Sequence, residues 1–449
     1  MKHFTGLLTV LGLLVFSMDV SARVLPADAR DKHLGVASCA SKQCHGAVRG
    51  DYKKSNMHRD EYRIWANPQY AESVNKSPNG SKHSRAYKVL LEKKSVEMAK
   101  KLGLKNAHEA KICLDCHADN VPVALRGEKF QIDDGIGCEA CHGGSDRYIK
   151  SHTERYATHQ DNVDAGMYPT ELEGARAELC LSCHYGTNKQ FATHRIMAAG
   201  HPRLSFELDT YTIDQEHYDI DADYKKRKRF AISAQVWATG IAETSKNMIR
   251  LIQGERFTKS GIYPEVALFD CHACHHTMND KRWAKTKTTI ALDPGAIRLS
   301  DSSLIMLYSI ASVLSADSDK HLLDAIQSLH KATTASREAV IKQSQDLEKI
   351  VDNLLQQISH FDFTKNKNKP MMLIRKQIVT LGSNGEFRDY NVAEQAVMAF
   401  DMLTYSISQD QYNAYVDDLD ALYKLLENDS LFDPALFAAE MTKLLAKIS

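Results

Sequence analysis

The spacing of the cysteines restricts the fold of this chain more than any other feature. Four times a Cys-x-x-Cys pair is followed at once by His. This spacing is the c-type haem attachment signature, in which two thioethers hold the porphyrin edge and the adjacent imidazole reaches the iron. The four motifs are Cys113, Cys116 and His117; Cys138, Cys141 and His142; Cys180, Cys183 and His184; and Cys271, Cys274 and His275. Because each haem replaces much of an apolar core, we expect loops to dominate where these motifs lie.

The remaining two cysteines form a widened version of the motif, Cys39-Ala-Ser-Lys-Gln-Cys44-His45. A longer loop between two thioethers is tolerable if it bulges away from the ring, since only the second Cys and the His must keep their register. The alternative is a disulfide between Cys39 and Cys44. The other eight cysteines belong to haem motifs and this pair keeps the Cys-His ending, so we predict five covalently attached c haems with their irons, and no disulfide.

Histidine is concentrated in the same part of the chain. Of the 20 His residues, 16 lie between His33 and His276, and five of these are the proximal residues of the motifs. Eleven therefore remain for the opposite faces of the irons, enough for two imidazoles on every haem. Such bis-His ligation suits electron transfer, whereas an open sixth position suits substrate chemistry.

Three stretches carry a resemblance to a known family. They are Asp134-Gly-Ile-Gly-Cys-Glu-Ala-Cys-His-Gly-Gly144, the segment from His194 through Gly200-His201-Pro202 to Leu208, and Phe269-Asp-Cys-His-Ala-Cys-His-His276. Roughly residues 35 to 285 resemble the cytochrome c-554-type multihaem family. The resemblance implies an exported electron-transfer domain with closely stacked haems and few long secondary elements. The chain departs from the tetrahaem carriers of that family in its widened first motif and its fifth haem site.

Candidate distal ligands follow from their local setting. His201 precedes Pro202, which holds its backbone in an extended segment, and His194 lies two helical turns earlier if the segment between them is helical. His152 follows His142 by a short return loop. The resemblance implies distal roles for His276 and for His83, with His58 as the competitor of His83. For His108, His159, His217 and His272, a surface or propionate-bonding position is at least as good an interpretation. We therefore predict as distal ligands His83, His152, His194, His201 and His276.

The first 22 residues have the pattern of a secretory leader. Lys2 precedes an apolar run from Leu7 to Phe16, and Val20-Ser21-Ala22 offers a small-residue cleavage site. We expect a periplasmic or otherwise exported protein, cleaved near Ala22, with no transmembrane segment in the mature chain, because about ten strongly apolar residues are too few to span a bilayer. The 57 basic residues cancel the 57 acidic ones, which disfavours nucleic acid as a partner.

Residues 296–449 contain no Cys and show helical periodicity, for example Leu347, Val351, Leu354 and Ile358. Asp433 before Pro434 is a favourable helix start. The chain is thus predicted to be mainly α: a signal peptide (1–22), a loop-rich multihaem cytochrome domain (23–295) with helices near 95–101 and 232–252, and an antiparallel bundle of four to six helices (296–449).

These features predict an exported pentahaem cytochrome that receives electrons from a quinol-linked or soluble donor and passes them to another redox protein, with no catalytic residue of its own. The alternative is a reductase or oxidase of a small nitrogen or sulfur oxyanion at one five-coordinate haem. Pentahaem nitrite reductases are a poor match, because their active haem carries Lys where all five motifs here end in His. An assembly or scaffold role for the bundle would not require five haems.

Overall fold

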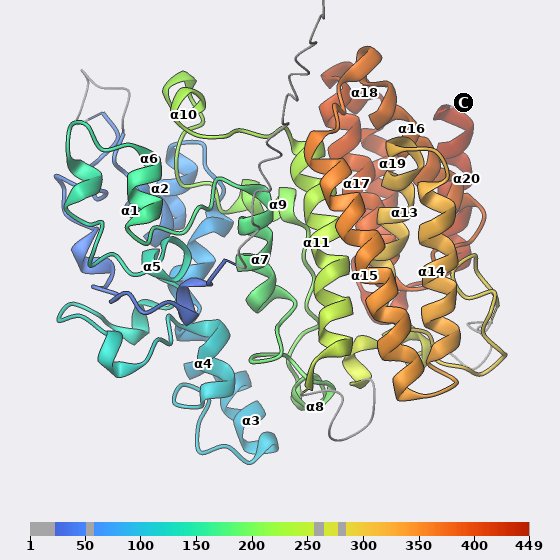
Figure 1. Ribbon diagram of the computed structural model, residues 1–449, viewed down its shortest axis with the longest axis horizontal. Coiled ribbons are helices and arrows are strands. Elements are labelled where there is room, and N and C mark those ends of the chain that lie inside the picture. Colours follow the sequence, from blue (N-terminus) through green and yellow to red (C-terminus); the bar gives the residue numbers. More distant parts are fainter. Residues whose placement is uncertain (1–22, 51–57, 256–264, 277–283, 449) are drawn as a thin grey trace, which may run out of the picture.

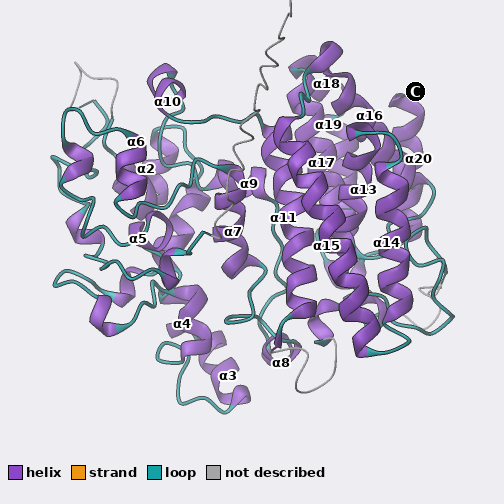
Figure 2. Cartoon of the chain, viewed as in Figure 1, coloured by secondary structure: helices purple, strands orange, loops and turns teal. Residues whose placement is uncertain are grey.

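The computed structural model describes residues 23–50, 58–255, 265–276 and 284–448, so the predicted leader lies outside the described residues. The described part is mainly helical, as predicted (Figure 2). Its extended segments pair only in two isolated bridges, His33 with Arg126 and Phe269 with Leu299. Figure 1 shows two parts side by side, a loop-rich amino-terminal part and a carboxy-terminal bundle.

The amino-terminal part consists of short helices joined by long loops. Its helices are α1 (Glu61–Ala66), α2 (Pro68–Ser73), α3 (Lys93–Leu102), α4 (Lys111–His117), α5 (Cys138–His142), α6 (His159–Asp164), α7 (Glu173–His184), α8 (His194–Ala199), α9 (Leu208–Asp214) and α10 (Ala222–Arg227). Buried apolar residues gather there only in small clusters, such as the one around Leu90 and Leu114. The protein interior of this part is therefore small, as expected where bound groups take the place of side chains.

The carboxy-terminal part holds the long helices. They are α11 (Ser233–Gln253), α13 (Ser302–Leu314), α14 (Ser318–Ala332), α15 (Arg337–His360), α16 (Lys365–Ser383), α17 (Tyr390–Ile407), α18 (Gln409–Ala414), α19 (Val416–Lys424) and α20 (Pro434–Ile448). One continuous apolar core runs through them. The predicted stripe of α15 is buried, and Asp433 caps α20 by accepting a hydrogen bond from Ala435 N at 2.8 Å.

The bundle differs from its prediction in the number of helices. Between residues 296 and 448 the described chain forms eight α-helices where four to six were expected. The apolar run from Tyr412 to Leu426 is divided between α18 and α19, because the chain breaks at Tyr415. α13 is buried over most of its surface, so it lacks the polar face that a periodicity search requires.

Helix α11 joins the two parts. It packs against α15, α13 and α17 on one side and against α7 and α9 on the other. Burial therefore runs all round it, and Trp237 is fully inaccessible. Although α11 falls within the range expected for the cytochrome domain, its apolar side chains belong to the core of the bundle.

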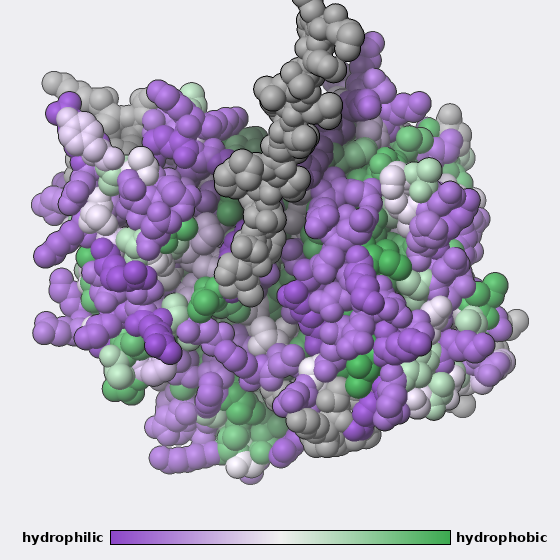
Figure 3. Space-filling view, in the orientation of Figure 1, coloured by the Kyte–Doolittle hydropathy of each residue, from purple (hydrophilic) through white to green (hydrophobic). Residues whose placement is uncertain are grey.

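Hydrophilic side chains cover most of the described surface on the face seen in Figure 3, over both parts of the molecule. No helix among residues 23–50, 58–255, 265–276 and 284–448 has the length and apolar character needed to cross a membrane.

Candidate functional site

We number the five Cys and His motifs in chain order, from the first (Cys39, Cys44, His45) to the fifth (Cys271, Cys274, His275). The second motif lies on α4, the third forms α5, and the fourth ends α7; the fifth begins at the 3-10 turn Cys271–Ala273. On a helical turn, residues three apart share a face. The spacing therefore presents both thiols of these three helical motifs on one side, with the His directly after them.

The widened first motif is a compact loop. Cys44 N donates to Ser41 O at 3.0 Å, and His45 N donates to Cys39 O at 3.1 Å, so the extra residues fold back as a turn. Cys39 and Cys44 are free thiols, as are the other eight cysteines. This arrangement keeps both thiols available for thioether formation.

Each of the five motif histidines faces a second histidine across a gap. The ring-centroid separations are 6.3 Å for His45 and His152, 6.3 Å for His117 and His201, 6.1 Å for His142 and His217, 6.0 Å for His184 and His83, and 6.3 Å for His275 and His194. The angles between the ring planes range from 9° to 79°. Because the separation is nearly constant while the tilt is not, direct stacking does not account for the pairs.

The constant separation matches a metal ion held between two imidazoles. Two metal–nitrogen bonds of about 2.0–2.1 Å, each extended to the centre of its ring, put the centroids about 6.3 Å apart. Within the described residues, no group of three or more His, Cys, Asp or Glu side chains is arranged to hold a metal ion. Each pair thus suits an ion whose other ligands come from a planar group between the rings, and the Cys pair beside it suits covalent attachment of that group.

Hydrogen bonds at Nδ1 orient the rings. Nδ1 of His45 donates to Glu61 Oε2 at 3.1 Å, and Nδ1 of His83 donates to Gln215 Oε1 at 2.5 Å. Backbone carbonyls accept from Nδ1 of His117, His152, His201 and His217. With the proton fixed on Nδ1, the Nε2 lone pair is left for a metal, as is usual for histidines that bind metals through one ring nitrogen and donate a hydrogen bond from the other.

Burial keeps the inner imidazoles neutral. It lowers the pKa of His142 to about 3 and that of His184 to about 4, and it lowers the pKa of His83, His117 and His217 as well. A neutral imidazole is the form that binds a metal, so these rings are ready as ligands at pH 7.

Of the predicted distal ligands, His83, His152, His194 and His201 each lie opposite a motif histidine. The structure pairs the motif histidine His275 with His194. The partner of His142 is His217, which sequence reasoning did not select. His217 has no proline or motif beside it, so nothing local in the sequence distinguishes it from the other loop histidines.

Four other histidines have partners elsewhere. His33 Nδ1 donates to Asp119 Oδ2 at 2.7 Å, and Nε2 of His272 lies 3.1 Å from Asp429 O. His58 and His159 pair with carboxylates. His58, the competitor of His83, therefore faces Asp219 rather than another imidazole.

Contacts between motifs give their spatial order. The Cys39 thiol raises the pKa of Cys138, and the Cys183 thiol raises the pKa of Cys116, so the two thiols of each pair lie close together. The first motif thus adjoins the third, and the second adjoins the fourth. Gln215 joins the third and fourth, since its side chain holds His83 and its carbonyl holds His217. α8 joins the fifth and second, because His194 begins it and His201 follows its end.

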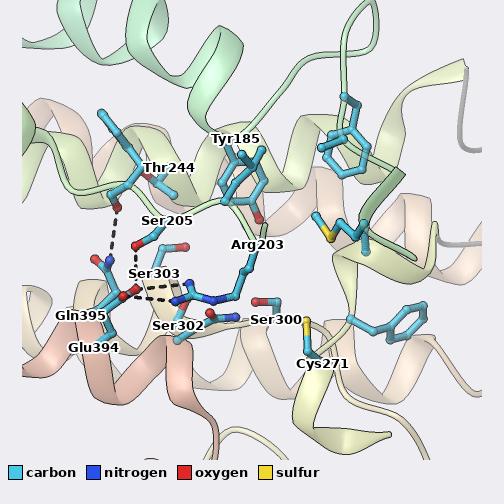
Figure 4. A pocket seen from close by; sticks show the side chains of 18 residues that line it. Tyr185, Arg203, Ser205, Thr244, Cys271, Ser300, Ser302, Ser303, Glu394 and Gln395 are labelled. Carbon is cyan, nitrogen blue, oxygen red and sulfur yellow. Dashed lines mark hydrogen bonds and ion pairs between the residues drawn. The ribbon is translucent and has the colours of Figure 1, made fainter. Parts of the chain in front are cut away.

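A cavity of about 90 Å³ lies beside the fifth motif, between the two parts of the molecule (Figure 4). Cys271 lines it, together with Tyr185 from the end of α7. Arg203 crosses it to form a bidentate ion pair with Glu394 of α17, at 3.1 and 3.2 Å, and Ser205 donates to the same carboxylate at 2.6 Å. The fifth motif is thus in direct contact with the bundle.

Attachment cysteines beside opposed imidazoles define the c-type cytochromes, the class of protein that binds haem c covalently through its cysteines and carries electrons on the haem iron. Residues 73–143, which hold the second and third motifs and His83, match the family model described as cytochrome c554 and c-prime. This segment is therefore similar to the cytochrome c554-type family, which confirms the resemblance inferred from the motifs. No curated protein and no solved structure matches the chain.

Proposed function

We propose that this protein is an exported electron carrier with five bis-His c haems. The observation that carries the proposal is that all five motif histidines have a histidine opposite them at a nearly constant separation. Iron held by an imidazole on each face changes oxidation state with little rearrangement, which is the chemistry that electron transfer needs. The proposed iron ligands are the five motif histidines with His83, His152, His194, His201 and His217.

The proposed path follows the contacts between motifs: first, third, fourth, second, fifth. Its two ends are the motifs with an exposed cysteine, Cys44 in the first and Cys274 in the fifth, while the other eight cysteines are partly covered. We therefore propose that one redox partner approaches the first motif and the other approaches the fifth. The inner three haems would connect them without meeting a partner.

The proposal of export rests on the leader pattern of residues 1–22 and on the c-type haem motifs. Its test is the amino terminus of the mature protein. We expect processing near Ala22 and recovery in the periplasmic fraction of a host that assembles c haems.

Haem count and spin state test the site itself. Intact-mass spectrometry should give the chain plus five haems, and the low-temperature EPR spectrum of the oxidised protein should show low-spin iron throughout, because each iron has two imidazoles. Nitrite, hydroxylamine and sulfite should neither bind nor be turned over with reduced viologen. A mass with four haems and an oxidised Cys39–Cys44 pair would show that the first motif binds no haem. A high-spin haem that turns over one of these compounds would show that the protein is a reductase and not an electron carrier.

A further inference from the structure

A buried cluster of charged groups lies next to the fifth motif. Arg298 Nε donates to Asp270 Oδ2 at 2.9 Å, and its second terminal nitrogen donates to Asp389 Oδ2 at 2.6 Å. Asp301 and His330 complete the cluster, with Nε2 of His330 3.8 Å from Asp301 Oδ2. None of these five side chains is more than 8% exposed. They come from different segments. Asp270 directly precedes the fifth motif, Arg298 lies beside the bridge residue Leu299, Asp389 and Asp301 precede α17 and α13, and His330 lies in α14.

The charges of the cluster do not balance. Three carboxylates face one guanidinium and one imidazole, and neither oxygen of the buried Asp301 has a hydrogen-bond partner. A buried carboxylate without a donor is costly as an anion. Burial and the charge of Asp270 raise the pKa of Asp389 to about 7, even though Arg298 opposes the shift. The cluster is therefore poised to bind a proton near neutral pH.

The cluster is electrically connected to the fifth haem site. Asp270 directly precedes Cys271, and its carboxylate accepts a hydrogen bond from His272 N at 2.9 Å. Burial raises the pKa of the Cys271 thiol, and the charges of Asp270 and Asp389 raise it further, while Arg203 lowers it. On the cavity side the charged groups are Arg203 and Glu394, which neutralise each other (Figure 4). A change of charge at this haem site is thus felt first by the buried carboxylates.

We propose that the Asp270, Asp389 and Asp301 cluster around Arg298 is a proton-binding site coupled to the fifth haem, a proposal that rests on the function proposed above. With a haem held at His275, one carboxylate of the cluster would take one proton from solvent for the one electron that the redox partner supplies, and it would become a neutral acid, so the total charge of the site would be unchanged. An added electron disfavours nearby anions, which gives the direction of the effect. Asp389 is the carboxylate that takes the proton, because burial and the charge of Asp270 raise its pKa.

The test is a redox titration of the full holoprotein at several pH values between about 5 and 9. One of the five midpoint potentials should fall with rising pH, by as much as 59 mV for each tenfold decrease in proton concentration, the factor for one electron. Asp389→Asn should flatten this slope. Asp301→Asn removes one of the charges that raise the pKa of Asp389, so it should move the slope to lower pH, and both replacements should leave the other four haems unchanged. Asp352→Asn, at a half-exposed carboxylate of α15 paired with Lys246, is the matched control and should keep it. His194→Ala should shift the same potential and so identify that haem as the fifth.

Infrared spectroscopy gives a second readout that needs no variant. The reduced-minus-oxidised difference spectrum of the wild-type protein should contain a new carboxylic acid C=O band that shifts in D2O. Potentials independent of pH, a slope unchanged in both Asn variants, or the absence of this band would each overturn the proposal. Failure of the proposed function itself is distinguishable, because it appears as fewer than five haems in the intact mass before any titration.

Discussion

At the scale of single residues, the site depends on the hydrogen-bond partner of each histidine at one ring nitrogen and on the lone pair that remains at the other. The paired histidines hold an acceptor at Nδ1 in six cases, which leaves Nε2 without a proton. His33 and His58 pair with Asp119 and Asp219 and take part in no such ring pair among the described residues. Residue type and spacing along the chain do not separate these groups, since the difference lies in which segments meet in space.

We expect His217→Ala to convert one haem from low-spin to high-spin, because removal of its imidazole opens the position opposite His142. His58→Ala is the matched control, since His58 pairs with Asp219, and it should leave all five haems low-spin. EPR of the two oxidised variants measures the difference. An unchanged low-spin spectrum of His217→Ala would exclude His217 as an iron ligand.

We expect Glu61 to tune the proposed first haem through His45. Its carboxylate accepts the Nδ1 proton, which raises the pKa of His45 and makes the imidazole a stronger donor to oxidised iron. Glu61→Gln should therefore raise the midpoint potential of one haem, as measured by spectroelectrochemical titration. Glu72→Gln, an exposed carboxylate of α2, should change none. A lowered potential in Glu61→Gln would contradict this role.

The ten attachment cysteines and the five proximal histidines could be predicted from the sequence, because a haem attachment motif consists of a few consecutive residues. The distal side has no such local rule. His201 could be selected because Pro202 restricts its backbone, whereas the position of His217 depends on long-range packing between the segment after α9 and α5. A single chain carries no local sign of that packing.

At the scale of elements, α11 has the largest effect on the architecture. Its helical nature was predictable from residues 232–252, but its role was not, because periodicity does not tell which neighbours cover a helix. Gly240 lies where α11 crosses α9, and a methyl group at that position would fall on Leu208 Cβ. The close approach of the two helices therefore requires the missing side chain.

Gly240→Ala should destabilise the protein by about 1–3 kcal/mol, the usual cost of overpacking. Gly174→Ala in α7 is the matched control: its new methyl group would lie 3.5 Å from Glu243 Oε1, an ordinary contact, so the helix should gain about 0.5–1 kcal/mol. Urea unfolding followed by circular dichroism measures both changes. Equal effects of the two substitutions would show that α9 and α11 do not approach as described.

At the scale of the whole molecule, the bundle and the cytochrome part share α11. The core that contains Leu347 and Val351 of α15 also contains Met248, Ile249 and Ile252 of α11. Residues 296–449 alone would expose this face to water. The boundary predicted from the last cysteine therefore divides one apolar core.

A fragment of residues 230–449, produced without haem, should fold cooperatively, whereas a fragment of residues 296–449 should aggregate or melt without a sharp transition. Thermal unfolding followed by circular dichroism, with light scattering, compares the two. Cooperative melting of the shorter fragment would mean that α13, α15 and α17 cover one another without α11.

The histidine pairs also have a consequence for the path by which the chain reaches its final state. The pairs close five loops, which run from His45 to His152, His83 to His184, His117 to His201, His142 to His217 and His194 to His275. Along the chain, the first histidine of each pair comes before the second histidine of the preceding pair. The second histidines follow one another in the same order as the first histidines. Each loop therefore overlaps the next one along the chain. A cut anywhere between His45 and His275 separates the two histidines of at least one pair. For the proposed exported carrier, the iron held by His45 would gain its second imidazole only after His152 emerges, and the later sites would be completed in the order in which the loops close.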